Sequence, residues 1–249
     1  MKEATRALFD AFDGHDAVGL RDALRAGADV HSLVDGKSPM EWLLEQYMRS
    51  DRLVDCLRWM LDAGATFPEV CWGPVLLNDA RGVEKMVREN PEVLKHRVRL
   101  KSAFTSLDGA SLLHLAAEYG NAEAVRGLLD VGMEVDNRAE RTSEGFNGHT
   151  ALFHTVNSNG NRSRNVMRVL LEAGARVDVR LEGLYWGRGF EWETLFFDVT
   201  PVSYAQMGLM PQVHRDEVAI YENIREMLRF AGRTELELGN VPNRYLVKG

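Results

Sequence analysis

Apolar residues recur with helical spacing along most of this chain, in short runs that come in pairs. The clearest pair lies in the segment 108–136, where Ser111 is placed to cap a first helix and Gly120 interrupts the chain before a second one. Gly132 follows the second run, at a position where left-handed backbone ends a helix. The apolar positions of the two runs are Leu112, Leu115 and Ala116, then Val125, Leu128 and Leu129. The pattern predicts two short helices lying back to back.

The openings and endings of this helix pair recur along the chain. Glycine follows a second apolar run at Gly27, Gly64, Gly132, Gly174 and Gly232, and a hydroxyl residue opens a first run at Ser38, Ser111, Thr150 and Thr200. Pro39 and Pro201 directly follow such a hydroxyl residue, and proline suits the first helical position because no amide donor is lost there. A single pair of helices cannot bury both its faces, so recurrence predicts a stack of such units.

With these residues in view, the chain resembles the ankyrin-repeat family, whose unit of about 33 residues opens on a Thr-Pro-Leu-His-type motif. The spacing from Gly27 to Gly64 is 37 residues, and that from Gly64 to Gly132 is 68, about twice the family period. A further repeat with a decayed opening motif is therefore expected at about 69–94. The irregular openings and the insertions resemble divergent bacterial members of the family.

The resemblance implies an all-α fold, an ankyrin-repeat solenoid of about six helix-turn-helix units with atypical terminal units and a short β-hairpin-like aromatic insertion. Repeats that touch only their neighbours form one elongated body, so we expect a single domain over 1–249. The approximate units are 1–34, 35–67, 68–104, 105–140, 145–180 and 198–232, with the insertion at 181–198.

Composition narrows the function classes. A net charge of -7 and a pI near 5.6 argue against a nucleic-acid partner, which requires clustered Lys and Arg. No apolar run reaches signal-peptide length or the ~20 residues of a membrane span, so we expect a cytoplasmic protein with no membrane partner. Cys56 and Cys71 have no metal-ligand spacing and are expected to be buried and reduced. No cofactor is expected.

The aromatic insertion is the largest departure from the repeat. Gly174 and Thr200 are 26 residues apart where the family spacing gives about 12, and the eighteen residues 181–198 hold six aromatics. Their order predicts a hairpin that turns at Gly187, Arg188 and Gly189, with Trp186, Phe190 and Trp192 on one face. The insertion either exposes a binding patch or folds back to cover the last repeats. Trp186, Arg188 and Trp192 are the candidates for exposure.

Two further insertions separate the helices of the last two units. The first holds Asn157, Asn159 and Arg162, and the second holds Met210 and His214. Insertions at the same place in consecutive repeats project from one edge, so these loops are expected to be neighbours. Together they form either a mixed pocket or two solvated loops. A smaller insertion at 138–148 should lie on the opposite edge, beside the hairpin.

The histidines are the candidates for chemistry. His114 is expected to make a local hydrogen bond that ties adjacent turns. His154 falls at an inward apolar position, as Tyr204 does in the next unit, and a satisfied core contact between the two is favoured over a proton-transfer site. A carboxylate beside His154 or His214 would come from Glu191, Glu193 or Asp198, and a metal site from His149, His154 and His214 has no supporting spacing.

No HExxH, phosphate-binding glycine loop or GxSxG motif occurs, so we predict no enzyme, no catalytic residue and no metal. The leading hypothesis, which the family resemblance implies, is a protein–protein interaction module or scaffold that uses hairpin tips, the concave helix surface and the C-terminal insertions. The alternative is a pocket for a small molecule or peptide beneath the aromatic insertion, with or without a catalytic role. Self-association through the insertions is a third reading, although a monomer is slightly favoured. The predicted contact residues are Trp186, Arg188, Phe190, Trp192, Asn157, Asn159, Arg162, Met210 and His214.

Overall fold

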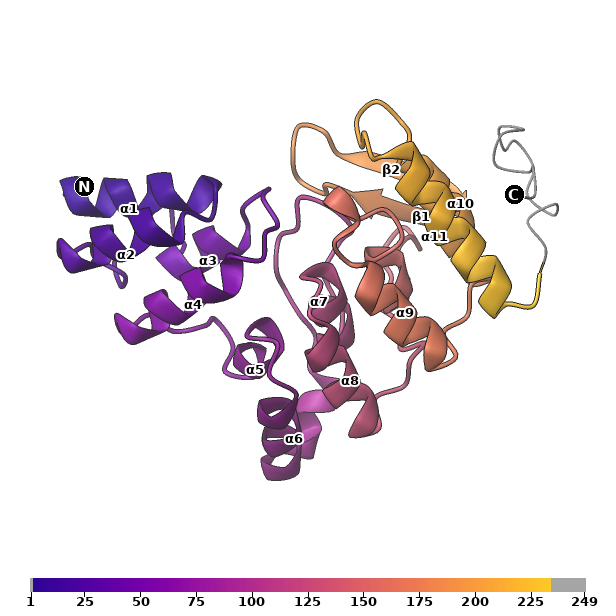
Figure 1. Cartoon of the computed structure of the whole chain (residues 1–249), viewed down its shortest axis with the longest axis horizontal. Coiled ribbons are helices and arrows are strands. Elements are labelled where there is room, and N and C mark those ends of the chain that lie inside the picture. The colour runs from indigo at the N-terminus through magenta and orange to yellow at the C-terminus, as the bar shows by residue number, and fades with distance from the viewer. Residues whose placement is uncertain (1, 234–249) are drawn as a thin grey trace.

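The computed structural model describes residues 2–233, in which short helices stack side by side from the N-terminus to the last long helix (Figure 1). The α-helices are α1 (Glu3–Asp13), α2 (Ala17–Arg25), α3 (Pro39–Leu44), α4 (Leu53–Asp62), α5 (Trp72–Leu76), α6 (Ala80–Glu89), α7 (Leu112–Glu118), α8 (Ala122–Asp130), α9 (Arg164–Glu172), α10 (Pro201–Met207) and α11 (Glu217–Phe230). Three 3-10 turns accompany them: η1 (Pro91–Lys95), η2 (Ala151–His154) and η3 (Asn159–Asn161). No helix of this part of the chain is long and apolar enough to span a membrane.

The helices alternate between a first and a second element of each pair. In the pair that opens at Thr150, the short 3-10 turn η2 takes the place of the first helix and α9 is the second. The second helices α6, α8 and α9 pack on one another in sequence, and α7 packs on η2. One hydrophobic core therefore runs through the stack from Leu8 to Leu228.

Local sequence signals account for where the helices begin and end. Ser38 and Thr200 each form a capping box, the first with Glu41 and the second with Ser203. The glycines that follow the second helices adopt left-handed backbone, with φ of 93° at Gly64 and 94° at Gly132. The expectation that Gly132 ends its helix in this conformation is confirmed.

The segment 69–94, where a repeat with a decayed opening was expected, contains α5 and α6. Asp79 caps α6 by accepting a hydrogen bond from the amide of Gly82. Val83 and Val87 of α6 are buried, and α6 packs against α8. Helical spacing of apolar residues was thus sufficient to place these helices, although the opening motif is missing.

The aromatic insertion forms an antiparallel pair of strands, β1 (Leu181–Trp186) and β2 (Thr194–Val199). Trp186 pairs with Thr194, so the connection spans residues 187–193 and is longer than the predicted turn. Phe190 and Trp192 lie in this connection, because the amide of Phe190 donates to Gly187 O at 3.0 Å and folds the chain into a further turn. The predicted shared strand face of Trp186, Phe190 and Trp192 is therefore wrong.

The hairpin packs back onto the segment 102–106, which precedes α7. The amide of Gly187 donates to Phe104 O at 2.7 Å, and Thr105 forms a bridge with Trp186. Trp186 is only 1% exposed as a result, so its expected exposure is wrong. The insertion at 138–148 lies beside the hairpin as expected, since the amide of Asn147 donates to Gly183 O at 2.8 Å.

Candidate functional site

The first helices in the middle of the stack are covered on every side. All residues of α7 and of η2 are buried, although one face of a first helix would be open in a regular stack. The segment 102–106 and the hairpin provide the cover, with Ser102 bonded to Glu118 of α7 and the amide of Ser106 bonded to Tyr185 O. The concave helix surface, expected to bind a partner, is therefore closed at these two units.

Glu118, at the end of α7, is the centre of a buried polar cluster. Its carboxylate lies 2.8 Å from His154 Nδ1, 3.3 Å from Ser102 Oγ and 3.5 Å from Arg49 Nη2. The carboxylate beside His154 thus comes from Glu118 and from none of the predicted residues. Asp198 pairs with Arg180, and Glu193 accepts a hydrogen bond from the amide of Gly189. Buried charges need such partners because removing them from water is costly.

Three histidines continue the cluster away from Glu118. His154 Nε2 lies 3.1 Å from His149 Nε2, and His114 Nε2 lies 3.0 Å from the carbonyl oxygen of His149. Because the amide of Ser111 donates to His114 Nδ1, the proton of His114 is on Nε2 and is donated to that carbonyl. His114 thus ties α7 to the turn before η2, which confirms its expected structural role.

Burial keeps two of these histidines neutral. Desolvation lowers the pKa of His114 to about 3, with the nearby His154 adding to the effect, and the pKa of His149 falls well below its usual value for the same reasons. Both histidines are 0% exposed. Their geometry stabilises the junction of α7 and η2 and gives no access to a substrate.

Tyr204 does not contact His154 in the predicted core pair. Its hydroxyl lies 3.0 Å from Thr105 Oγ1, and its carbonyl oxygen accepts a hydrogen bond from Asn157 Nδ2. Complete burial raises the pKa of the Tyr204 hydroxyl further above its usual range. The expected pairing was wrong because the segment 102–106 inserts above both residues and supplies a hydroxyl partner.

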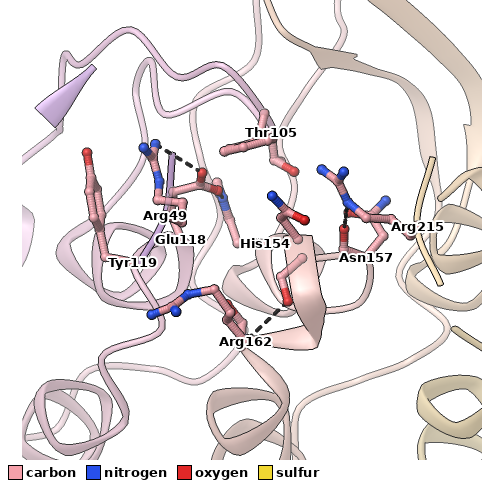
Figure 2. Close-up of a pocket in the computed structure, with 12 residues that line it drawn as sticks. Arg49, Thr105, Glu118, Tyr119, His154, Asn157, Arg162 and Arg215 are labelled. Atoms are coloured by element: carbon pink, nitrogen blue, oxygen red, sulfur yellow. Dashed lines mark hydrogen bonds and ion pairs between the residues drawn. The ribbon is translucent and has the colours of Figure 1, made fainter. Parts of the chain in front are cut away.

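A narrow pocket opens beside the polar cluster (Figure 2). Its wall includes Glu118 and His154 together with three arginines. Arg49 lies in the loop between α3 and α4, Arg162 in the loop between η2 and α9, and Arg215 in the loop between α10 and α11. About 20 Å³ of it is open to water. Arg215 Nε donates to Asn157 O at 2.8 Å, which confirms that the two C-terminal loops are neighbours.

Four aromatic rings meet next to this pocket, and we call them the ring cluster: Tyr47, Phe104, Phe190 and Trp192. The Tyr47 ring lies 5.0 Å from Phe104 and 5.7 Å from Trp192, and Phe190 stacks on Trp192 at 4.7 Å. Trp192 is held in place because its Nε1 donates to Ala103 O at 3.1 Å. Tyr47 is 44% exposed, and Phe190 and Trp192 are half-buried.

The structure separates the predicted contact residues into three groups. Asn157, Asn159 and Arg162 line the pocket, whereas Phe190 and Trp192 belong to the ring cluster. The remaining residues lie elsewhere: Trp186 in the core, Arg188 over the ring of Tyr185, and Met210 and His214 on the loop between α10 and α11, outside the pocket wall.

Within residues 2–233, no three His, Cys, Asp or Glu side chains are arranged to hold a metal ion, and His214 does not join His149 and His154. Cys56 and Cys71 are buried free thiols, as expected, and burial raises the pKa of each to about 11.

Comparison with known families matches residues 78–180 to a model of ankyrin repeats in three copies. The chain contains ankyrin repeats. The matched segment runs from the start of α6 to the end of the loop after α9, and the aromatic hairpin begins directly after it. No curated protein matches the chain. Ankyrin repeats are generally protein–protein interaction modules and are typically non-enzymatic.

Sequence reasoning missed several residues of the pocket and the ring cluster. Tyr47 and Arg49 lie in the loop between α3 and α4, and the 37-residue spacing from Gly27 to Gly64 was a signal that this unit is overlong. Glu118 is the one acidic residue in the run 112–119, which is otherwise apolar apart from His114, and this is a signal for a buried partner. Nothing in the pattern of 102–106 indicated that Phe104 would join aromatic rings from both halves of the chain.

Proposed function

We propose that this ankyrin-repeat chain binds another protein and that the ring cluster is the centre of the contact. The observation that carries the proposal is the meeting of rings from three separate segments at a partly exposed surface, where Tyr47 joins Trp192 and Phe190 over Phe104. Aromatic residues dominate the binding energy of protein interfaces because each buries a large area at a small entropic cost.

The rings are held rigidly enough to act as anchors. The indole of Trp192 is fixed by its hydrogen bond to Ala103, and Phe190 is stacked against it. Lys101 Nζ lies 3.9 Å from the centre of the Phe190 ring, which adds a cation at the rim of the surface. Groups that are already ordered lose little conformational freedom on binding, so more of the contact energy appears as affinity.

The same surface explains the position of the aromatic insertion. Trp186 attaches the hairpin to the core, and the connection 187–193 reaches the loop after α3, so residues of both halves of the stack contribute to one patch. Both interpretations of the insertion therefore apply to different residues: Trp186 covers the repeats, and Phe190 and Trp192 are available for contact. Met210, His214 and Arg188 stay candidate contacts.

The proposal is tested by capture of partners from a lysate of the source cells on immobilised protein. Wild-type protein is compared with Tyr47→Ala and Phe190→Ala, each checked for an unchanged thermal unfolding midpoint. The matched control is Val70→Ala, because Val70 is apolar and 92% exposed but lies in the loop before α5, away from the ring cluster.

A partner identified with the wild type should bind each ring variant roughly 30-fold more weakly, since a hot-spot truncation costs about 2 kcal/mol or more. Val70→Ala should bind like the wild type. Equal recovery of that partner by wild type and both ring variants would refute the proposed surface.

A further inference from the structure

We propose that the pocket between Arg49, Arg162 and Arg215 binds the carboxylate of an acidic side chain of the partner protein. This inference rests on the proposed function, because the pocket adjoins the ring cluster.

The wall of the pocket is positively charged although the chain as a whole carries -7. Three arginines line it together with one carboxylate residue, Glu118. Glu118 pairs with Arg49 and also lies beside His154 and Ser102, so its single negative charge offsets only one of the three arginines. Arg162 pairs with Asp51, but Asp51 is 95% exposed and water screens that attraction. A second anion in the pocket would complete the charge balance.

Arg49 provides an observation independent of this charge count. Its side chain is nearly buried, with the guanidinium group 5.2 Å from the ring of Phe104 and 4.6 Å from that of Tyr119. Its Nη1 donates to backbone carbonyls, but its buried Nε has no hydrogen-bond partner among the described residues. An unsatisfied buried donor is costly, and a donor beside a positively charged pocket attracts an anionic acceptor.

The positive charges of the surrounding arginines also favour a negatively charged ligand. His15, which is buried behind the loop 49–52, has its pKa lowered to about 4, first by burial and then by the charges of Arg49, Arg162 and Arg52. On this side Arg52 donates a hydrogen bond to the carbonyl oxygen of Gly14, and His15 Nδ1 lies 2.9 Å from the hydroxyl of Ser50. This region therefore disfavours a further cation and favours an anion.

The size of the pocket selects the kind of anion. The space open to water is about 20 Å³, little more than the room that one water molecule needs, so a ligand can insert only a small terminal group. A carboxylate is small and planar and matches the planar donor pattern of a guanidinium group. A nucleotide or any other ligand with a bulky body would require the arginine side chains to leave their present positions.

The position of the pocket indicates where the carboxylate comes from. Phe104 lines the pocket and also contacts Tyr47, and Arg215 lies 5.5 Å from the Phe104 ring. A partner segment that lies across the ring cluster therefore passes the mouth of the pocket. Its recognition sequence would place a glutamate or aspartate next to an aromatic or apolar residue, so that one side chain enters the pocket and the other packs on the rings.

The test uses four probes with the full chain: a capped tetrapeptide with glutamate next to tryptophan, the same peptide with glutamine in place of glutamate, acetate, and inorganic phosphate. Binding is followed by NMR of the arginine Nε–H groups and by calorimetry. The variants are Arg162→Gln and Arg215→Gln. Arg168→Gln is the matched control because Arg168 lies on α9, is about half exposed, pairs with Glu226 and does not line the pocket. Each variant must retain the wild-type unfolding midpoint.

We expect the glutamate peptide to shift the Arg49 Nε–H signal and to bind the wild type and Arg168→Gln equally. Loss of one charged hydrogen-bond donor should weaken its binding to Arg162→Gln and Arg215→Gln roughly tenfold or more. The inference is overturned if the glutamine peptide binds as well as the glutamate peptide, or if acetate alone binds as tightly, which would indicate a site for a free small acid. Inorganic phosphate binding more tightly than either peptide at the same arginines would also overturn it.

Failure here is distinguishable from failure of the proposed function. If Tyr47→Ala releases the captured partner and the arginine variants do not, the ring cluster is the contact surface and the carboxylate site is wrong. If the arginine variants lose the glutamate peptide while no partner depends on Tyr47 or Phe190, the pocket binds carboxylates and the ring cluster is not the contact surface.

Discussion

The buried histidines make a quantitative prediction about acid stability. His114 is completely buried, and its pKa falls from 6.5 to about 3 in the folded chain, because desolvation disfavours the charged ring. In the unfolded chain the same ring takes up a proton near its ordinary pKa of about 6.5. Lowering the pH from 7 to 5 therefore protonates the His114 ring in the unfolded chain and leaves it neutral in the folded chain. The free energy of unfolding must therefore fall.

The size of the effect follows from the two pKa values. Proton uptake stabilises the unfolded state by about 0.2 kcal/mol at pH 7 and by about 2 kcal/mol at pH 5, so His114 alone removes close to 2 kcal/mol from the stability. His149 contributes a loss of the same sign, since its pKa is also lowered by burial and by the neighbouring histidines. The stabilisation is complete above the unfolded pKa and decreases as the pH falls toward the folded value.

Urea denaturation followed by tryptophan fluorescence at pH 7, 6 and 5 measures this dependence. His114→Asn should be less stable at pH 7, because it loses the hydrogen bond to the His149 carbonyl, but it should lose about 2 kcal/mol less than the wild type between pH 7 and pH 5. His31→Asn is the control, since His31 is exposed, and it should follow the wild-type pH dependence. If His114→Asn and the wild type lose equal stability over this range, the reasoning is refuted.

Three further predictions concern stability and are measured by urea denaturation at pH 7. Trp186→Ala should lower the free energy of unfolding by about 3–5 kcal/mol, because the ring is buried between the hairpin and Phe104; a loss below about 1 kcal/mol would mean that the hairpin does not pack as described. Glu118→Gln should lower the free energy of unfolding by about 3–5 kcal/mol, because it leaves Arg49 without its buried partner. The double variant Glu118→Leu with Arg49→Met should be more stable than either single variant of that pair. Additive losses in the double variant would contradict the pairing. Gly132→Ala should lower the free energy of unfolding by about 1–2 kcal/mol, because the backbone there is left-handed and open space leaves no steric clash to add to the cost. The control Gly14→Ala should lower it less, because Gly14 is equally open but has a negative φ.

The chemical role of the polar cluster is the point where sequence reasoning came closest and still failed in detail. An inward His154 with a buried partner was predicted, and the structure confirms the burial. The partner is Glu118, which lies 36 residues away in the chain, and not Tyr204. Sequence spacing predicted which positions face inward, but it carried no information on which inward side chains would meet after the segment 102–106 was laid over them.

The sequence alone determined the helix pairs and their ends. Capping by Ser38 and Thr200 and left-handed backbone at Gly132 depend on interactions within a few residues, so they are readable from short segments. Ankyrin-like spacing also located α5 and α6 in a segment without the opening motif.

Only the tertiary structure decided which aromatic residues are exposed and where the arginines gather. Trp186 and Trp192 are six residues apart in one insertion, yet the first is in the core and the second is at the surface. The pocket joins Arg49, Arg162 and Arg215 from three loops far apart in the chain. Such contacts depend on how the repeats stack and on which segment covers them, and the free energy that selects them comes from burial summed over the whole core.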